Sequence, residues 1–182
     1  MLKSDLSNIM FLDIETVPQT GDFSELNPEL AHLWEDKFGT IQKRMPEKYG
    51  EETTAAEAFN TSAGIYSEFG KIVCISVGFI YYKDLDMHFR TKSFSGDDEK
   101  QILIDFTALI AKFCTTKEHT FCGHNIKEFD IPYICRRMLI NGLKLPSVIN
   151  ISGKKPWEIS FYDTHWNCGN LAIIKTIHRS NS

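Results

Sequence analysis

Two acidic residues near the start of the chain, Asp13 and Glu15, have the type and spacing of metal ligands. They lie in the mostly apolar run of residues 9–16, which has the composition of a β-strand. Because successive side chains of a strand alternate between faces, these two carboxylates share one face. Divalent cations neutralise such a pair, and carboxylate oxygens suit Mg²⁺ and Mn²⁺. The alternative is a strand that has reached its solvent end, where the two acids simply end the burial.

A second polar group lies where a predicted strand at residues 120–122 leads through a Gly-His-Asn turn into a helix. Apolar residues after the turn recur at helical spacing, and Pro132 suits the first turn of a helix. Asp130 therefore falls at the strand-to-helix junction, near the positive end of the helix dipole. An aspartate at this position most often caps a helix. Asn125 follows the same strand and is a second residue of a capping type, but one helix needs only one cap.

Together, these two groups resemble the motifs of the DEDD (DnaQ-like) superfamily of 3′-5′ exonucleases, which have an RNase H-like fold. The first motif, D-x-E, matches Asp13 and Glu15. The second motif, N-x-x-x-F/Y-D, matches Asn125, Phe129 and Asp130. The combination of both motifs in one chain is far more specific than either motif alone.

The similarity is greatest to the predicted PolB-like exonuclease branch, because of residues 69–78 and the Gly-His-Asn sequence of the second motif. It runs from about residue 8 to about residue 164. It implies a metal-dependent hydrolase that removes nucleotides from free 3′ ends, with single-stranded DNA favoured over RNA and a role in DNA repair. An RNA-directed enzyme of the same fold is also consistent with these residues.

The resemblance also implies a role for each matched residue. Two Mg²⁺ or Mn²⁺ ions would be bound by three catalytic carboxylates, those of Asp13, Glu15 and Asp130. Asn125 would hold the terminal nucleotide or orient the second motif, and Thr16 is expected to contact substrate. Phe129 would be either a core residue or a base-stacking side chain.

The C-terminal part departs from the superfamily, which places a fourth carboxylate and a His or Tyr base on a last helix. No Asp or Glu follows Asp163, which we expect to cap a strand. His165 and His178 are the alternatives for the base, and His124 is expected to be structural. We therefore expect residues 165–182 to be the atypical tail of a truncated chain with impaired activity. The alternative is a catalytically inactive relative that binds nucleic acid or a protein.

The composition is that of one domain with a hydrophobic core: the chain has 182 residues, of which 42% are hydrophobic. The 5 cysteines include no C-x-x-C pair, so we expect reduced thiols in a cytoplasmic protein. No run of residues is long and apolar enough to span a membrane. The net charge is −4, with 12 basic against 20 acidic residues before position 127 and 8 against 4 after position 126. This balance predicts modest affinity for long nucleic acids.

The predicted elements follow the order β-β-β-α-β-α-β, which by resemblance is an α/β, RNase H-like fold with a mixed five-stranded sheet flanked by helices. The predicted strands cover residues 9–16, 71–82, 87–94, 120–122 and 159–163, with a turn at 84–86. One helix begins at residues 96–99, and another follows Asp130 and is capped by Gly142.

Residues 19–69 are expected to be a helical insertion between the first two strands of a single domain over residues 1–182. A clear amphipathic helix is predicted at residues 27–38 and a weaker one at 51–60. An insertion that begins just after two metal ligands would lie beside the active site and act as a lid or a substrate guide. The alternative is a helical hairpin that covers one edge of the sheet.

Overall fold

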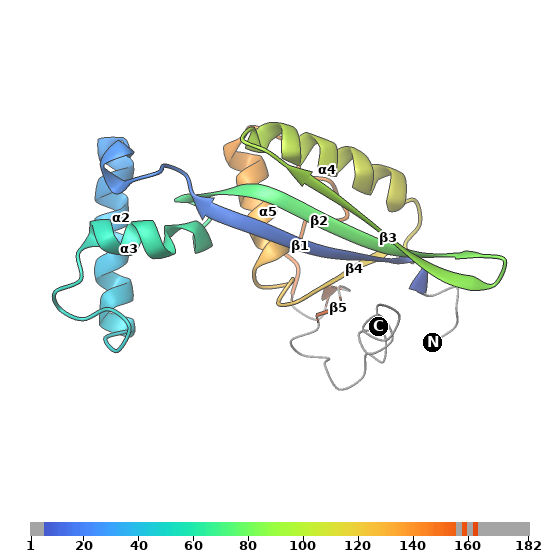
Figure 1. The fold of residues 1–182 in the computed structure, drawn as a ribbon, viewed down its shortest axis with the longest axis horizontal. Coiled ribbons are helices and arrows are strands. Elements are labelled where there is room, and N and C mark those ends of the chain that lie inside the picture. Colours follow the sequence, from blue (N-terminus) through green and yellow to red (C-terminus); the bar gives the residue numbers. More distant parts are fainter. Residues whose placement is uncertain (1–5, 156–157, 160–161, 164–182) are drawn as a thin grey trace. The chain divides into compact units, whose positions relative to one another are not determined.

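The computed structural model describes residues 6–155, 158–159 and 162–163 (Figure 1). The chain divides into two compact units, which are described separately. The sheet unit comprises residues 1–14 and 74–182, and the helical unit comprises residues 15–73.

The sheet is mixed and has the strand order β3-β2-β1-β4-β5. Its strands are β1 (Ile9–Pro18), β2 (Gly70–Lys83), β3 (Asp86–Ser95), β4 (Thr120–Gly123) and the two-residue β5 (Tyr162–Asp163). β2 and β3 are antiparallel, whereas β4 is parallel to both β1 and β5. This mixed α/β architecture is consistent with the predicted RNase H-like fold. The predicted strand at 159–163 includes residues 160–161, which lie outside the described residues.

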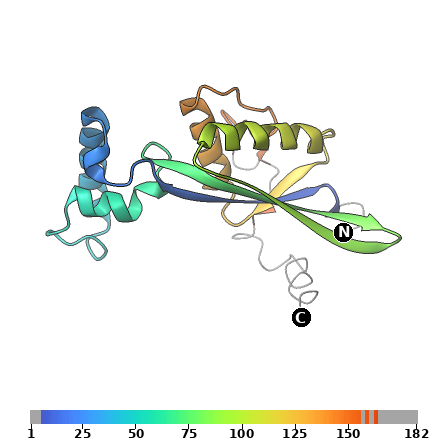
Figure 2. The ribbon, with the colours of Figure 1, turned by 45° about the horizontal axis from the view of Figure 1, so that its top comes forward.

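Two helices, α4 (Glu99–Phe113) and α5 (Asp130–Ile140), lie on the same face of the sheet (Figures 1 and 2). Apolar residues at helical spacing form their buried faces, as the sequence predicts. The side chains that are fully buried include Leu103, Phe106 and Ile110 in α4 and Ile131 and Ile134 in α5. The side chain of Asp98 accepts a hydrogen bond from the backbone N–H of Gln101 and so caps α4.

The β2–β3 hairpin is tighter than the sequence suggests, because Lys83 pairs directly with Asp86. Asp84 and Leu85 alone form the turn, with φ angles of 50° and 74°. Positive φ at both central residues is the geometry that matches the twist of a two-residue hairpin. The predicted turn at 84–86 and strand start at residue 87 were therefore wrong by one residue.

The helical unit contains two α-helices, α2 (Pro28–Arg44) and α3 (Ala55–Ser62), and two short 3₁₀ helices (Phe23–Glu25 and Ala63–Ile65). The side chain of Asn27 caps α2, as its position in the sequence suggests. The predicted end of α2 at residue 38 was too early, because Ile41 continues the buried face for another turn. The prediction of a helix at 51–60 was similarly displaced, because Thr54 and Glu57 form a capping box that starts α3 at Ala55.

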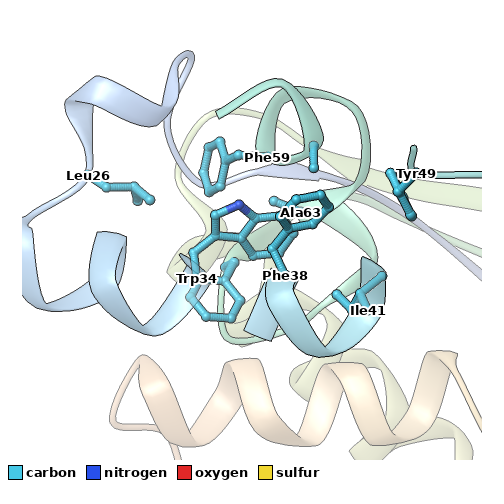
Figure 3. Close-up of a cluster of buried hydrophobic side chains, with 9 residues drawn as sticks. Leu26, Trp34, Phe38, Ile41, Tyr49, Phe59 and Ala63 are labelled. Carbon is cyan, nitrogen blue, oxygen red and sulfur yellow. The ribbon is translucent and has the colours of Figure 1, made fainter. Parts of the chain in front are cut away.

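The helical unit has a hydrophobic core of its own, centred on Trp34 (Figure 3). The Trp34 ring makes edge-on contacts with Phe59 and Phe69, at centroid distances of 5.5 and 5.1 Å. Its indole N–H donates a hydrogen bond of 2.7 Å to the carbonyl oxygen of Ala55, so the buried polar atom is satisfied. Residues 15–73 thus bury an aromatic cluster among themselves.

Two other sequence predictions concern the C-terminal part of the chain. The residue that caps α5 is Asn141, not Gly142 as predicted; Gly142 follows it with φ of 70°. The backbone N–H of Leu143 bonds to the carbonyl of Met138, which is the closing bond of a Schellman motif. The predictions for residues 165–182, including His165 and His178, lie outside the described residues.

Among the helices that the structure describes, none is long and apolar enough to cross a membrane.

Candidate active site

The first acidic residue, Asp13, lies on an exposed position of β1 between the buried side chains of Leu12 and Ile14. Glu15 follows two residues later in the same strand and is also exposed. The alternation of buried and exposed residues therefore agrees with the expectation that the two carboxylates share one face of the strand.

The parallel pairing of β1 with β4 brings the second motif next to Asp13. Phe11 pairs with Cys122, so Asp13 and His124 each lie two residues further in the same direction. Parallel strands end at the same edge of a sheet, and the turn after β4 therefore begins beside Asp13. This strand register brings together two parts of the chain that are more than 100 positions apart in the sequence.

The turn between β4 and α5 is held by two special backbone positions, Gly123 and Asn125. A Cβ atom on Gly123 would lie 2.6 Å from the carbonyl oxygen of Leu12, a separation that real side chains do not show. Asn125 has φ of 53°, a left-handed conformation that asparagine tolerates better than most residues. Its carbonyl accepts hydrogen bonds from the N–H groups of Glu128 and Phe129. The turn geometry thus limits which residues fit beside Asp13.

Asp130 is the first residue of α5, and its side chain is only 3% exposed. The residue in the capping position is Phe129, whose side chain makes no capping hydrogen bond, so Asp130 lies one residue inside the helix. A carboxylate at this position lies near the positive end of the helix dipole. Burial of a charged group is costly unless it is paired or binds a cation.

A cavity of about 340 Å³, here called the site cavity, joins the two motifs. Its lining residues are Asp13, Ile14, His124, Asn125, Phe129 and Asp130. Four of the six predicted site residues therefore line one cavity. Glu15 and Thr16 continue β1 within the residues assigned to the helical unit and do not line it.

One residue of the site cavity, His124, was expected to be only structural. Its side chain is exposed and lines the site cavity together with Asp13 and Asp130. The position of His124 directly before Asn125 in the turn was the signal in the sequence that could have identified it.

A second cavity, of about 550 Å³ and here called the sheet groove, crosses the middle of β1, β2 and β3 and the end of β4. Phe11 and Phe89 meet there edge to face, at a centroid distance of 5.8 Å. The ring of Phe89 lies over Gly78, where a Cβ atom would be only 2.4 Å away. Asp13 and His124 line the sheet groove as well as the site cavity, so the two cavities adjoin each other at these residues.

The residues of the site cavity offer oxygen ligands of the kind that Mg²⁺ and Mn²⁺ prefer. The carboxylates of Asp13 and Asp130 line the same cavity, and Asp130 is buried there. Within the described residues, however, no three side chains of His, Cys, Asp or Glu are grouped closely enough to form a metal centre. Of the three predicted metal ligands, Asp13 and Asp130 line the site cavity, whereas Glu15 does not.

Residues 3–168 match the family described as DNA polymerase family B, exonuclease domain. The chain belongs to this family of DEDD-type 3′-5′ exonuclease domains, in its PolB-like branch, which confirms the resemblance found in the sequence. The family normally uses divalent metals, and its substrates are nucleic acids. Searches of curated proteins and of solved structures found no match.

Proposed function

We propose that this chain is a metal-dependent 3′-5′ exonuclease domain that hydrolyses single-stranded DNA from a free 3′ end. The observation that carries the proposal is that Asp13 and the buried Asp130 line one cavity although they come from separate motifs. The family match supports the class of reaction. A role in DNA repair is part of the same proposal.

In this proposal Asp13, Glu15 and Asp130 hold Mg²⁺ or Mn²⁺ by their carboxylate oxygens. A bound pair of such ions would supply an activated water and stabilise the leaving 3′ oxygen. The protein contributes a fixed position for the ligands. Burial of Asp130 at the first turn of α5 limits its rotamers, and the pairing of β1 with β4 fixes Asp13 opposite the turn.

The neutral residues of the site cavity would position the nucleotide. Asn125 is held in a left-handed turn and offers an amide to the terminal sugar or base. Phe129 is half-buried and tilted against Tyr133 at a centroid distance of 5.5 Å, so part of its ring is available for a base. His124, at the junction of the two cavities, would donate a hydrogen bond to a phosphate oxygen, and Thr16 is proposed to contact substrate as well.

The sequence after Asp163 contains no acidic residue, so residues 164–182 supply no fourth carboxylate. The backbone of Asp163 pairs with Gly123, which places this residue at the same sheet edge as the turn beside Asp13. We expect weak cleavage by the 182-residue chain, since a two-metal site that lacks one ligand binds its second ion poorly. The alternative function is a catalytically inactive domain that binds nucleic acid or a protein.

The test uses a single strand of DNA labelled at its 5′ end, with and without a blocked 3′ end. With Mn²⁺ or Mg²⁺, we expect the free strand to shorten stepwise from its 3′ end and the blocked strand to resist. An Asp13→Ala variant is the control and should be inactive. Internal fragments from the blocked strand would identify an endonuclease instead. Binding of the free strand without any cleavage, under single-turnover conditions, would favour the inactive relative.

A further inference from the structure

A cavity of about 510 Å³ in the helical unit lies along one side of α2. It is lined by Lys37, Thr40, Ile41, Arg44, Met45 and Tyr66. All six residues belong to the helical unit, and none of them is part of either motif of the candidate active site. The cavity, here called the α2 cavity, combines two cations, two hydroxyl groups and an aromatic ring with the apolar side chains of Ile41 and Met45.

The cations of the α2 cavity share one stripe of the helix. Lys37, Thr40 and Arg44 are spaced by three and four residues, which places them on one side of α2. Lys43 is rotated about 100° from Arg44 around the helix axis and does not line the cavity.

The contacts of Lys37 show how this cavity can hold an anion. Its ammonium group lies 4.4 Å from the centroid of the Tyr66 ring. It also lies 3.7 Å from a carboxylate oxygen of Glu68, whose side chain is 54% exposed. An exposed ion pair of this length contributes little stability, and a phosphate can therefore replace the carboxylate. Tyr66 places a hydroxyl group in the same lining.

Most basic residues of the helical unit lie in one segment, and two of them, Lys37 and Arg44, line the α2 cavity. Residues 15–73 contain 5 basic and 11 acidic residues, and 4 of the 5 basic residues lie within positions 37–48. Stabilisation of the helix end accounts for Lys43 and Arg44, which lie in the last turn of α2. It does not account for Lys37, which lies in the middle of the helix and faces the cavity.

We infer that the α2 cavity binds the phosphate backbone of single-stranded nucleic acid. Arg44 holds one phosphate through its planar fork of donors, and Lys37 holds another after it releases Glu68. The inference rests on the proposed function in one respect, namely that nucleic acid is the ligand of this chain. It assigns to the helical unit a binding role of its own.

The experiment measures binding of a fluorescent thymidine 20-mer to the full chain by anisotropy in EDTA, so that no cleavage occurs. The Lys37→Gln/Arg44→Gln variant is compared with Lys43→Gln/Lys48→Gln, which loses the same charge from the same segment. We expect the first variant to weaken binding at least tenfold. It should also lower the slope of the log binding constant against log salt concentration by about 1.4, because each of the two lost phosphate contacts contributes about 0.7. We expect the second to weaken binding less than threefold. Equal effects of the two variants, or no effect, would overturn the inference.

A Glu68→Gln variant provides a test that does not depend on a loss of binding. Removal of the competing carboxylate should tighten binding of the 20-mer severalfold if Lys37 contacts a phosphate. Unchanged or weaker binding in this folded variant would contradict that contact. Cleavage of a small nucleotide ester with Mn²⁺ separates this inference from the proposed function. The Lys37→Gln/Arg44→Gln variant should cleave the ester as fast as wild type does. If wild type binds the 20-mer but never cleaves, that result refutes the proposed exonuclease activity and leaves this inference standing.

Discussion

Glu99 and Arg137 form a buried, two-pronged ion pair that joins the start of α4 to α5, with distances of 2.8 Å from Nε to Oε1 and 2.6 Å from Nη2 to Oε2. The side chains are only 8% and 7% exposed. Asn141 donates a further hydrogen bond of 2.8 Å to the same carboxylate. Because α5 carries Asp130 at its first turn, this pair helps to fix the helix that supplies a predicted metal ligand.

We predict that Arg137→Ala lowers the free energy of unfolding by about 3–5 kcal/mol, because it leaves the Glu99 carboxylate buried without its main partner. Denaturation in urea measures the change. Arg136→Ala is the matched control, since Arg136 is exposed on the same helix and should alter stability by less than about 0.5 kcal/mol. A loss equal to that of the control would show that the ion pair contributes nothing to the fold.

We predict opposite effects for alanine at two glycines. Gly123→Ala should destabilise the chain by about 1–3 kcal/mol, because its Cβ would lie 2.6 Å from the Leu12 carbonyl oxygen. Gly39→Ala, within α2, should stabilise it by about 0.5–1 kcal/mol, because no atom lies within 4 Å and alanine favours helix. Thermal unfolding of both variants tests this contrast. A stable Gly123→Ala protein would mean that β1 and β4 do not approach as closely as described.

Metal binding should depend on both motifs. We predict that Asp130→Asn and Asp13→Ala each weaken binding of Mn²⁺ at least tenfold, because each removes a charged oxygen ligand from the site cavity. Calorimetry with Mn²⁺ is the measurement. Asp105→Asn, at an exposed position of α4, is the control and should bind Mn²⁺ as wild type does. Affinity that is unchanged in both site variants would exclude the proposed metal site.

Two thiols predict a loss of stability at alkaline pH. Burial raises the pKa of Cys114 and of Cys135 to about 11, from the ordinary value of 9.0. A group whose pKa is higher in the folded state stabilises the fold below its unfolded pKa, and this contribution is lost as pH rises through the folded pKa. Stability should therefore decline between about pH 9 and 11. Cys135→Ala should flatten that decline in urea titrations; an identical slope would assign the decline to other groups.

The sequence predicts much of the fold because its signals are local. The apolar run of β1 and the helical spacing of α5 mark these elements in the chain itself, and the D-x-E motif identifies Asp13 directly. Some boundaries were displaced, as at α3 and the β2–β3 turn, because capping side chains and pair register decide them within one or two residues. The position of Asp13 beside the turn at His124 depends on the pairing of β1 with β4, which no local pattern encodes. Neither the Glu99–Arg137 pair nor the α2 cavity could be predicted, since both require packed helices.

The two-residue turn of the β2–β3 hairpin offers a practical route to a reporter on this protein. Leu85 is 83% exposed and has φ of 74°, so its side chain leaves the surface without supporting the core. The described cysteines are buried or half-buried. A Leu85→Cys thiol would be more accessible to a maleimide dye than these cysteines are. Leu85 lies in the turn that follows β2, away from the groove residues Ser76 and Gly78. Fluorescence from a dye at that position would follow the binding of single-stranded DNA in real time, while both motifs retain their native residues.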